Sequence, residues 1–267
     1  NQKLIGSRKS YATIGGKGGR STLIGLGKVG RPVITAALFV FFAVGIIMPI
    51  VILVMESFML KEGIYSLDNF TLHYWIGESN PQIMEGLPGI FKNDEFINSL
   101  FNSLRLTLVN GVFGTIFGQL LGYITAKGRG RLHGKLVEQL VFIPYLIPSV
   151  AFGGIYLSMF SQPQQIFGVT LVPALYGTFA LLTLVSVVKH LPFAARAGTS
   201  NMLQISGELE EAATIEGAGF FRRFVKIVFP LSKGGFISGF MLIFVSIMKE
   251  LDLIILIMTP TTSTLPY

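Results

Sequence analysis

Five long apolar stretches, separated by polar segments, dominate the pattern of hydrophobic and polar positions along the chain. They cover residues 32–55, 96–126, 136–160, 166–188 and 234–258. A helix needs about 20 apolar residues to cross the hydrocarbon core of a bilayer, and each stretch reaches this length. The pattern therefore predicts an all-α integral membrane protein with five transmembrane helices in this chain, and we expect a sixth helix beyond residue 267.

Some of these stretches contain residues that are unusual in a lipid-facing helix. Polar side chains interrupt the second stretch, and they should face other helices or a cavity rather than lipid; they are Asn98, Asn102, Arg105, Asn110 and Gln119. The third stretch contains Pro144 and Pro148, and the fourth contains Pro173. We expect all of them to lie within membrane spans.

The composition supports a chain that lives in lipid. Hydrophobic residues make up 51% of the chain and charged residues 13%, with a mean hydropathy of +0.64. A soluble domain carries about 25% charged residues. This chain has about half that share, which is too few charged residues to cover its apolar core in water. The chain contains no cysteine, which excludes disulfides, thiolate metal sites and cysteine nucleophiles.

The distribution of positive charge predicts an orientation. The net charge is +7, and 17 of the 21 Lys and Arg residues fall in segments 1–31, 127–135 and 189–233. Segment 56–95 is mostly acidic and holds two of them. Because cytoplasmic loops carry the excess of Lys and Arg, we expect a multi-pass protein with a cytoplasmic N-terminus, a basic cytoplasmic leader over 1–31, a transmembrane domain over 32–267 and an external segment over 56–95.

Several short motifs suggest chemistry that their context does not support. Residues 25–30 read Gly-Leu-Gly-Lys-Val-Gly, but a dinucleotide site needs a strand before this pattern and a βαβ unit around it, so a flexible loop is the better interpretation.

The sequence also disfavours metal binding, nucleic-acid binding and catalysis. His73, His133 and His190 are far apart, which disfavours a metal site. Basic runs interleaved with exposed aromatics are missing, so we expect no nucleic-acid partner. We also expect no catalytic residues and no enzymatic activity in this chain.

Segment 189–233 has the features of a helix, a break and a second helix. Ser206 is a suitable N-cap, and the acidic residues Glu208, Glu210 and Glu211 follow in the first turns, where the helix dipole favours negative charge. Gly217 and Gly219 allow a turn. Then Phe220, Phe224 and Ile227 recur at helical spacing, and Pro230 ends the element. Taken alone, this pattern is equally typical of an amphipathic connector on the membrane surface.

The same segment also resembles a known family. Glu211-Ala212-Ala213, then Gly217, then Ile227 and Pro230 have the spacing of the EAA signature of permeases from binding-protein-dependent ABC importers of type I. The match departs from the family pattern at Phe229, where leucine is usual. Since phenylalanine is also apolar, we expect the helix to be preserved.

The resemblance implies a mechanical role for this cytoplasmic loop. In the family, the loop forms a coupling helix that inserts into a cleft on the cytoplasmic ABC ATPase. It implies that Glu211 makes the main polar contact, that Ala212 and Ala213 allow close approach, and that Gly217 sets the turn. The implied partners are an ATPase dimer that binds ATP and Mg²⁺, a second permease half, an external substrate-binding protein and membrane lipid, with no cofactor in this chain. The resemblance also implies that residues 32–267 are a permease domain and that the membrane is the plasma (inner) membrane of a prokaryote.

Three charged residues near the end of the fifth stretch need a separate interpretation. Lys249-Glu250-Leu251 resembles a triplet found in the ferric-iron, thiamine and polyamine branch of these permeases. Counted along a helix from Gly234, Glu250 would lie roughly 24 Å into the span. Lys249, Glu250 and Asp252 then either form an interfacial cluster or line the solute pathway or its gate.

Two other functional classes are weighed against the importer permease. An ion-coupled secondary transporter would show inverted repeats and paired broken helices, and it would leave the EAA-like loop unexplained. A membrane-embedded enzyme would need a catalytic constellation. The importer permease is therefore the preferred hypothesis, with ferric iron or another small solute as the expected substrate.

Overall fold

The computed structural model describes residues 25–267, so residues 1–24 of the expected basic leader lie outside the described part. The described residues divide into two compact units, residues 25–98 and residues 99–267. Each unit is described by itself.

The first unit begins with one continuous helix of 30 residues that is apolar and long enough to cross a membrane. It consists of α2 (Gly27–Phe42), a π-helical turn (Ala43–Ile47) and α3 (Met48–Glu56). The first predicted span is therefore confirmed as a helix. It starts earlier than expected, because the helix takes in Gly27 and Gly30, which the sequence pattern placed in a flexible loop.

The rest of the first unit is a set of short helical pieces around Trp75, as expected for segment 56–95. Its bounds are Leu67–Asn69, α4 (His73–Ile76), Met84–Gly86 and Ile90–Lys92. The Trp75 ring stacks on Phe58 at 5.5 Å and lies 5.9 Å from Phe91. A hydrogen bond and the positive charge of Lys92 lower the pKa of the exposed Glu78 carboxyl.

The second unit holds the remaining long helices. Following α5 (Asp94–Lys127), which crosses the boundary between the units, its elements in chain order are α6 (Leu132–Leu146), α7 (Ser149–Phe160), β1 (Gln164–Ile166), β2 (Val169–Val172), α8 (Phe179–Met202), α9 (Gly207–Ile215), α10 (Phe220–Arg223), a π-helical turn (Phe224–Val228), α11 (Phe229–Leu231), α12 (Lys233–Met248) and a final turn (Pro260–Thr262).

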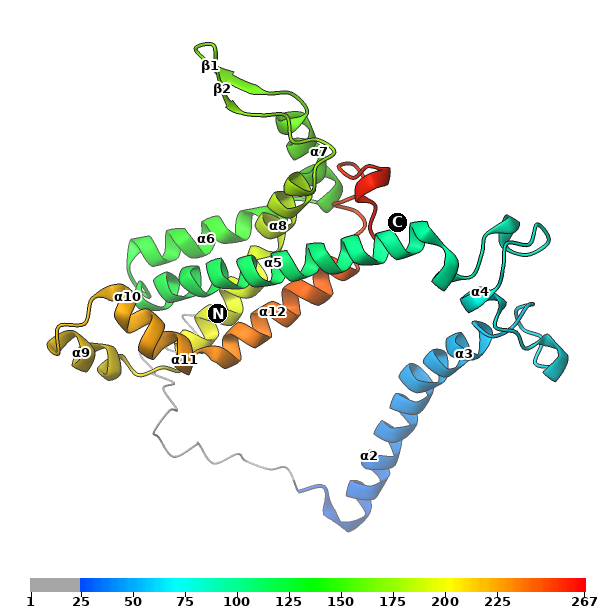
Figure 1. The fold of residues 1–267 in the computed structure, drawn as a ribbon. Coiled ribbons are helices and arrows are strands. Elements are labelled where there is room, and N and C mark those ends of the chain that lie inside the picture. Colours follow the sequence, from blue (N-terminus) through cyan, green and yellow to red (C-terminus); the bar gives the residue numbers. More distant parts are fainter. Residues whose placement is uncertain (1–24) are drawn as a thin grey trace. The chain divides into compact units, whose positions relative to one another are not determined.

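Helices α5, α8 and α12 run alongside one another in this unit (Figure 1). Glycines on α5 allow the close approach, as is typical of helix packing in membranes. A Cβ atom at Gly122 would lie 2.5 Å from the backbone nitrogen of Thr199 on α8, and one at Gly114 would lie 2.7 Å from Ile243 on α12. These contacts place α5 directly against both neighbours.

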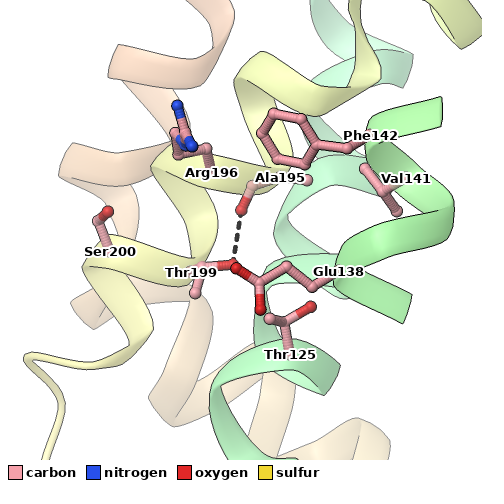
Figure 2. Close-up of a pocket in the computed structure, with 8 residues that line it drawn as sticks. All are labelled: Thr125, Glu138, Val141, Phe142, Ala195, Arg196, Thr199 and Ser200. Atoms are coloured by element: carbon pink, nitrogen blue, oxygen red, sulfur yellow. Dashed lines mark hydrogen bonds between the residues drawn. The ribbon is translucent and has the colours of Figure 1, made fainter. Parts of the chain in front are cut away.

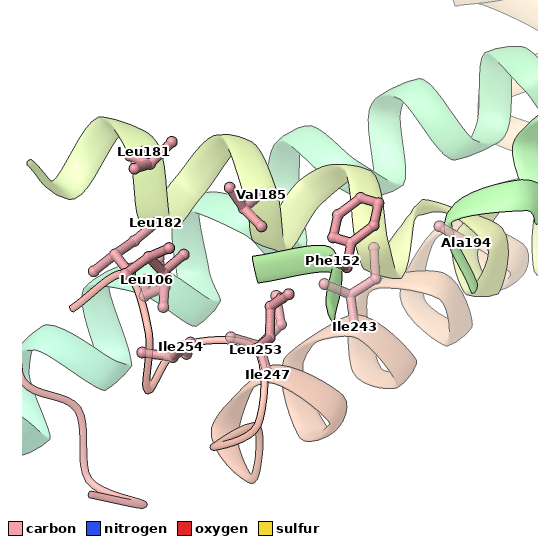
Figure 3. Close-up of a cluster of buried hydrophobic side chains, with 11 residues drawn as sticks. Leu106, Phe152, Leu181, Leu182, Val185, Ala194, Ile243, Ile247, Leu253 and Ile254 are labelled. Atoms are coloured by element: carbon pink, nitrogen blue, oxygen red, sulfur yellow. The ribbon is translucent and has the colours of Figure 1, made fainter. Parts of the chain in front are cut away.

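One buried apolar cluster holds the unit together (Figure 3). Its members come from α5, α7, α8, α12 and the segment that follows α12; they are Leu106, Phe152, Leu181, Leu182, Val185, Ala194, Ile243, Ile247, Leu253, Ile254 and Ile257. Most of them are completely shielded from solvent and lipid. The segment after α12 is therefore part of the core.

The third predicted span is not one straight helix. It consists of α6 and α7, whose axes differ in direction by 97°. The break lies at Ile147, whose backbone is extended (φ −81°, ψ 131°). The residue before a proline is disfavoured in helical conformation, so Pro148 explains the position of the break.

The fourth predicted span is wrong in its bounds. Residues 164–172 form the antiparallel hairpin β1–β2, which projects beyond α7 (Figure 1), so the fold is not strictly all-α. The helix instead covers Phe179–Met202, with the Thr178 hydroxyl accepting from Leu181 N at 3.4 Å as its N-cap. Residues 189–202, assigned to the cytoplasmic loop from the sequence, therefore belong to α8.

The fifth predicted span ends ten residues early, at Met248. Residues 249–257 form irregular turns, although Leu253, Ile254 and Ile257 are fully buried. Three helices in residues 25–267 are long and apolar enough to cross a membrane. The number is five if each bent pair, α6 with α7 and 220–231 with α12, counts as one span.

Candidate functional site

The EAA-like segment forms the predicted helix, break and second helix. Ser206 caps α9 by accepting a hydrogen bond from Glu208 N at 3.3 Å, which confirms the cap expected from the sequence. Gly217 has a φ of +80°, a conformation that side-chain-bearing residues rarely adopt. The chain turns there and continues into α10, at the end of the bundle where α5 ends (Figure 1).

One face of α9 is exposed and carries much of the EAA signature. Glu211 and Ala212 are exposed, Ala213 is half-buried and Gly217 is exposed. Next to them, the large apolar side chain of Ile215 is 86% exposed and is left uncovered by residues 25–267. An exposed apolar and acidic face on a short, capped helix is suited to docking into a cleft of another protein.

The opposite face of α9 is anchored by Glu210, a residue to which the sequence reasoning gave no separate role. Glu210 is 6% exposed. The Tyr123 hydroxyl donates to its Oε2 at 2.6 Å, and Lys127 Nζ lies 2.5 Å from its Oε1. Tyr123 and Lys127 both lie in the last turns of α5, so a charged, hydrogen-bonded contact ties α9 directly to a long helix of the bundle.

The second half of the loop packs against the same tyrosine. The rings of Phe220 and Phe224 lie 5.7 Å and 5.8 Å from that of Tyr123. The next buried residue is Val228, at 1% exposure, whereas Ile227 is half-buried and Pro230 is exposed. The sequence pattern placed Ile227 on the same apolar face as Phe220 and Phe224, but the buried residue is Val228. The shift by one residue arises because residues 224–228 form a π-helical turn, which takes more residues per turn than an α-helix.

A cluster of three ionisable side chains lies beside the middle of α8. Lys189 is 6% exposed and His190 is 3% exposed. Lys189 Nζ donates to the Pro144 carbonyl at 3.0 Å and to the Ile147 carbonyl, both at the end of α6. His190 Nε2 lies 3.4 Å from Glu250 Oε2. Glu250, expected either to belong to an interfacial cluster or to line the solute pathway or its gate, thus contacts α8.

The two other charged residues near Glu250 do not join this cluster. Lys249 and Asp252 are exposed, and all three follow the end of α12 rather than lying within a helix as expected. Glu250 is held in place by Leu253 N, which donates to its Oε1 at 3.2 Å. A role for Lys249 and Asp252 in a pathway stays a prediction.

A cavity of about 190 Å³ opens between α5, α6 and α8, and its lining includes none of the three residues of the charge cluster (Figure 2). It is lined by Thr125, Glu138, Val141, Phe142, Ala195, Arg196, Thr199 and Ser200. The Arg196 guanidinium lies over the Phe142 ring at 4.8 Å, and the Thr199 hydroxyl donates to the Ala195 carbonyl at 2.8 Å. The walls therefore offer both charges and several hydroxyls.

Following the resemblance of the EAA-like segment to importer permeases, we predict that Glu250→Gln lowers solute uptake about tenfold at normal protein level. Glutamine keeps the size of the side chain and can still accept from Leu253, but it removes the negative charge beside His190 and Lys189. Hydrogen bonds to charged groups are worth about 1.5–3 kcal/mol, and 1.4 kcal/mol corresponds to a factor of ten. Uptake in membrane vesicles measures the effect, with Glu62→Gln in segment 56–95 as control. Unchanged uptake in Glu250→Gln would leave Glu250 as an interfacial residue.

Residues 118–266 match the family described as binding-protein-dependent transport system inner membrane components. This match covers more than half of the chain and includes the whole EAA-like loop, the charge cluster and α12. Within the described residues, no group of three or more His, Asp or Glu side chains is placed to hold a metal ion.

Curated relatives with similar sequences are transport permeases. The chain is 27% identical over 165 residues to the sulfate transport system permease protein CysT of Synechocystis, covering 60% of this chain and 54% of the relative. It is 26% identical over 178 residues to the trehalose transport system permease protein SugB of Mycobacterium tuberculosis, covering 66% and 60%. A molybdate/tungstate permease, WtpB of Pyrococcus abyssi, is 27% identical, covering 60% of each chain. The chain thus spans less than two thirds of the length of these relatives.

A solved structure shares the fold. A chain of a bacterial alginate ABC transporter, crystallised with a periplasmic protein bound to an alginate pentasaccharide, superposes with a TM-score of 0.60. The superposition covers 88% of this chain and 78% of the other at 16% sequence identity. The similarity supports the arrangement of helices described above.

Proposed function

Because the chain belongs to the family of binding-protein-dependent transport system inner membrane components, we propose that it is the transmembrane permease subunit of an ATP-driven ABC importer. The observation that carries this proposal is the geometry of α9. Its outer face exposes Glu211, Ala212 and Ile215, while its inner face is fixed to α5 through Glu210. A short helix that is free on one side and anchored on the other suits the transfer of force between subunits.

We propose that the exposed face of α9 docks into a cleft of a cytoplasmic ATPase. Two such ATPases would bind ATP and Mg²⁺, and their closure would move two permease halves between inward-facing and outward-facing states. Transport then depends on the difference in ligand affinity between the two states, and no bond is made or broken in this chain. The second half is another copy, a related chain or a fused segment.

The orientation that we propose places the N-terminus and α9 in the cytoplasm. Arg129 and Arg131 lie in the short turn between α5 and α6, and Arg222, Arg223 and Lys226 lie in the α9–α12 connection. By contrast, segment 161–178, which contains the hairpin β1–β2, carries no Lys or Arg. The asymmetry supports five crossings with the hairpin and segment 56–95 outside, where a binding protein would deliver the solute.

The substrate that we propose is a small hydrophilic solute. The Lys249-Glu250-Leu251 triplet favours ferric iron, whereas the relatives that match carry the names of sulfate, trehalose and molybdate or tungstate permeases. Oxyanions and sugars are therefore included with iron among the solutes to be compared in uptake assays.

A charge reversal at Glu211 tests the proposed coupling. We expect Glu211→Arg to abolish co-purification of an ATPase with the tagged full-length chain and to abolish ATP-dependent uptake. The arginine would face the polar surface that is expected to bind the Glu211 carboxylate, and like charges across a docked surface cost several kcal/mol. Co-purified ATP hydrolysis and vesicle uptake are the measurements. Glu62→Arg, an equal change in the external segment, is the matched control and should retain both.

The same experiment separates the importer from an ion-coupled secondary transporter. If Glu211→Arg retains both the ATPase and ATP-dependent uptake, the role proposed for α9 is wrong. If the wild-type chain takes up solute with an ion gradient and without ATP, the importer proposal itself is wrong.

A further inference from the structure

The bend between α6 and α7 leaves the ends of two helices within the length of one predicted membrane span. The last carbonyl groups of α6 and the first N–H groups of α7 have no partners within their own helices. In a membrane, such groups must find partners elsewhere in the protein, because lipid offers none. Residues 144–149 at the bend therefore need support from other elements.

Lys189 supplies partners at the α6 end. Its ammonium donates to the carbonyl oxygens of Pro144 and Ile147, on either side of the last residue of α6. The side chain comes from the middle of α8 and lies over the ring of Phe152 at 5.4 Å. A cation at this end also matches the negative end of the α6 dipole.

Glu250 fixes the segment after α12 on which α7 packs. Leu253 N donates to Glu250 Oε1 at 3.2 Å. Leu253 in turn contacts α7 directly, because a Cβ atom at Gly153 in α7 would lie 2.7 Å from the carbonyl oxygen of Leu253. The carboxylate thus holds the backbone segment that supports α7.

His190 follows Lys189 in α8 and contacts Glu250, so it connects these two charged residues. Its Nδ1 lies 2.9 Å from the Ser186 carbonyl and its Nε2 lies 3.4 Å from Glu250. Both ring nitrogens thus face oxygen acceptors, and the ring is fixed between α8 and the segment after α12. The bend is consequently held by two separate parts of the chain that are about 60 residues apart in sequence.

We propose that Lys189 and Glu250 are positioning residues that fix the α6–α7 bend against α8 and against the segment after α12. The geometry makes these three parts one mechanical body, because moving the end of α6 would separate Lys189 from its carbonyl partners, and moving α7 would open its contact with Leu253. Buried ionisable side chains in membrane spans are rare because they are costly, and they mark function by default. Here the function is to hold the bent element in register when α9, which follows the C-terminal end of α8, is moved.

The proposal deepens the proposed permease function, since it assigns the bend to the moving part of a transporter. Its structural core, the support of the bend, is measured independently of transport. Hydrogen exchange of the full-length chain in membranes reports the opening of residues 147–153 directly. Solute moved per ATP hydrolysed, in the complex with its ATPase, reports the positioning role.

We expect Lys189→Met to raise amide exchange in residues 147–153 at least tenfold, with α9 unchanged. We also expect it to lower the solute moved per ATP hydrolysed, a ratio that a loss of folded protein alone would not alter. Lys189→Arg keeps a cationic donor and should restore both values in part. Lys135→Met, the same change at an exposed position of α6, is the matched control and should alter neither.

Glu250→Gln provides the second variant in case Lys189→Met does not accumulate. It should raise exchange at the start of α7. The positioning role is overturned if exchange in residues 147–153 is unchanged in every Lys189 and Glu250 variant that folds. If exchange responds but the wild-type chain shows no ATP-driven transport, the support of the bend stands and the permease function fails.

Discussion

A chain in which leucine replaces Gly122 is expected not to accumulate as a folded membrane protein. Gly122 lies on α5 at its closest approach to α8, where a Cβ atom would be 2.5 Å from the Thr199 nitrogen and 2.6 Å from the Gly198 carbonyl carbon. Both atoms belong to the backbone of α8, so no side chain can rotate away. Leucine would force the two helices apart, and overpacking of this kind belongs to the rare class that costs more than about 4 kcal/mol.

The measurement is the yield of monodisperse protein from membranes, together with its thermal unfolding temperature. Gly122→Ala should give an intermediate loss, since it adds one methyl group to the same contact. Gly45→Leu is the matched control, because a Cβ atom at Gly45 in the first span meets nothing within 4 Å. Normal yield and stability of Gly122→Leu would show that α5 and α8 do not approach as described.

The second large effect is expected from Glu210→Ala, which should uncouple ATP hydrolysis from solute movement. The substitution removes the acceptor for Tyr123 and the partner of Lys127, while Glu211 and the exposed face of α9 are untouched. A hydrogen bond to a charged group contributes about 1.5–3 kcal/mol, and the lower value applies to Lys127 because it is partly exposed. The ATPase should remain attached, and uptake should fall about tenfold or more.

A double-mutant cycle separates this anchor from a general loss of stability. Tyr123→Phe removes the hydroxyl that donates to Glu210, so its effect on uptake should largely disappear in the Glu210→Ala background. ATP hydrolysis by the purified complex is measured in parallel. Fully additive effects, or uptake that falls only together with ATPase attachment, would contradict the anchoring role.

The sequence predicted those elements whose signals are local. The first two spans were found because their apolar runs are long, and α9 was found because Ser206 and the following acidic residues mark a helix start. The hairpin was missed because an apolar run such as residues 164–172 is compatible with a strand or a buried helix. The true extent of α8 was hidden by Lys189, His190 and Arg196, which hydropathy excludes from a span although two of them are buried.

The same limit applies to the candidate site. Glu211 was singled out by its motif, and the structure places it on the exposed face of α9. Its neighbour Glu210 was not given a role, because its partners Tyr123 and Lys127 are more than 80 residues away in sequence. Glu250 was named as a charge in a span, yet its contact with His190 depends on α12 ending at Met248 and on the turns that follow.

The early end of α12 has a consequence for the surrounding lipid. Sixteen residues of helix reach about 24 Å, which is shorter than a hydrocarbon core of about 30 Å, whereas α5 has 34 residues and reaches about 51 Å. Neighbouring helices of such unequal length impose a hydrophobic mismatch on the lipids around the protein. The mismatch is relieved by tilt of the long helix and by thinning of the bilayer beside the short helix. We therefore expect bilayer thickness to act on this protein, with acyl-chain length changing the tilt of α5 relative to the membrane.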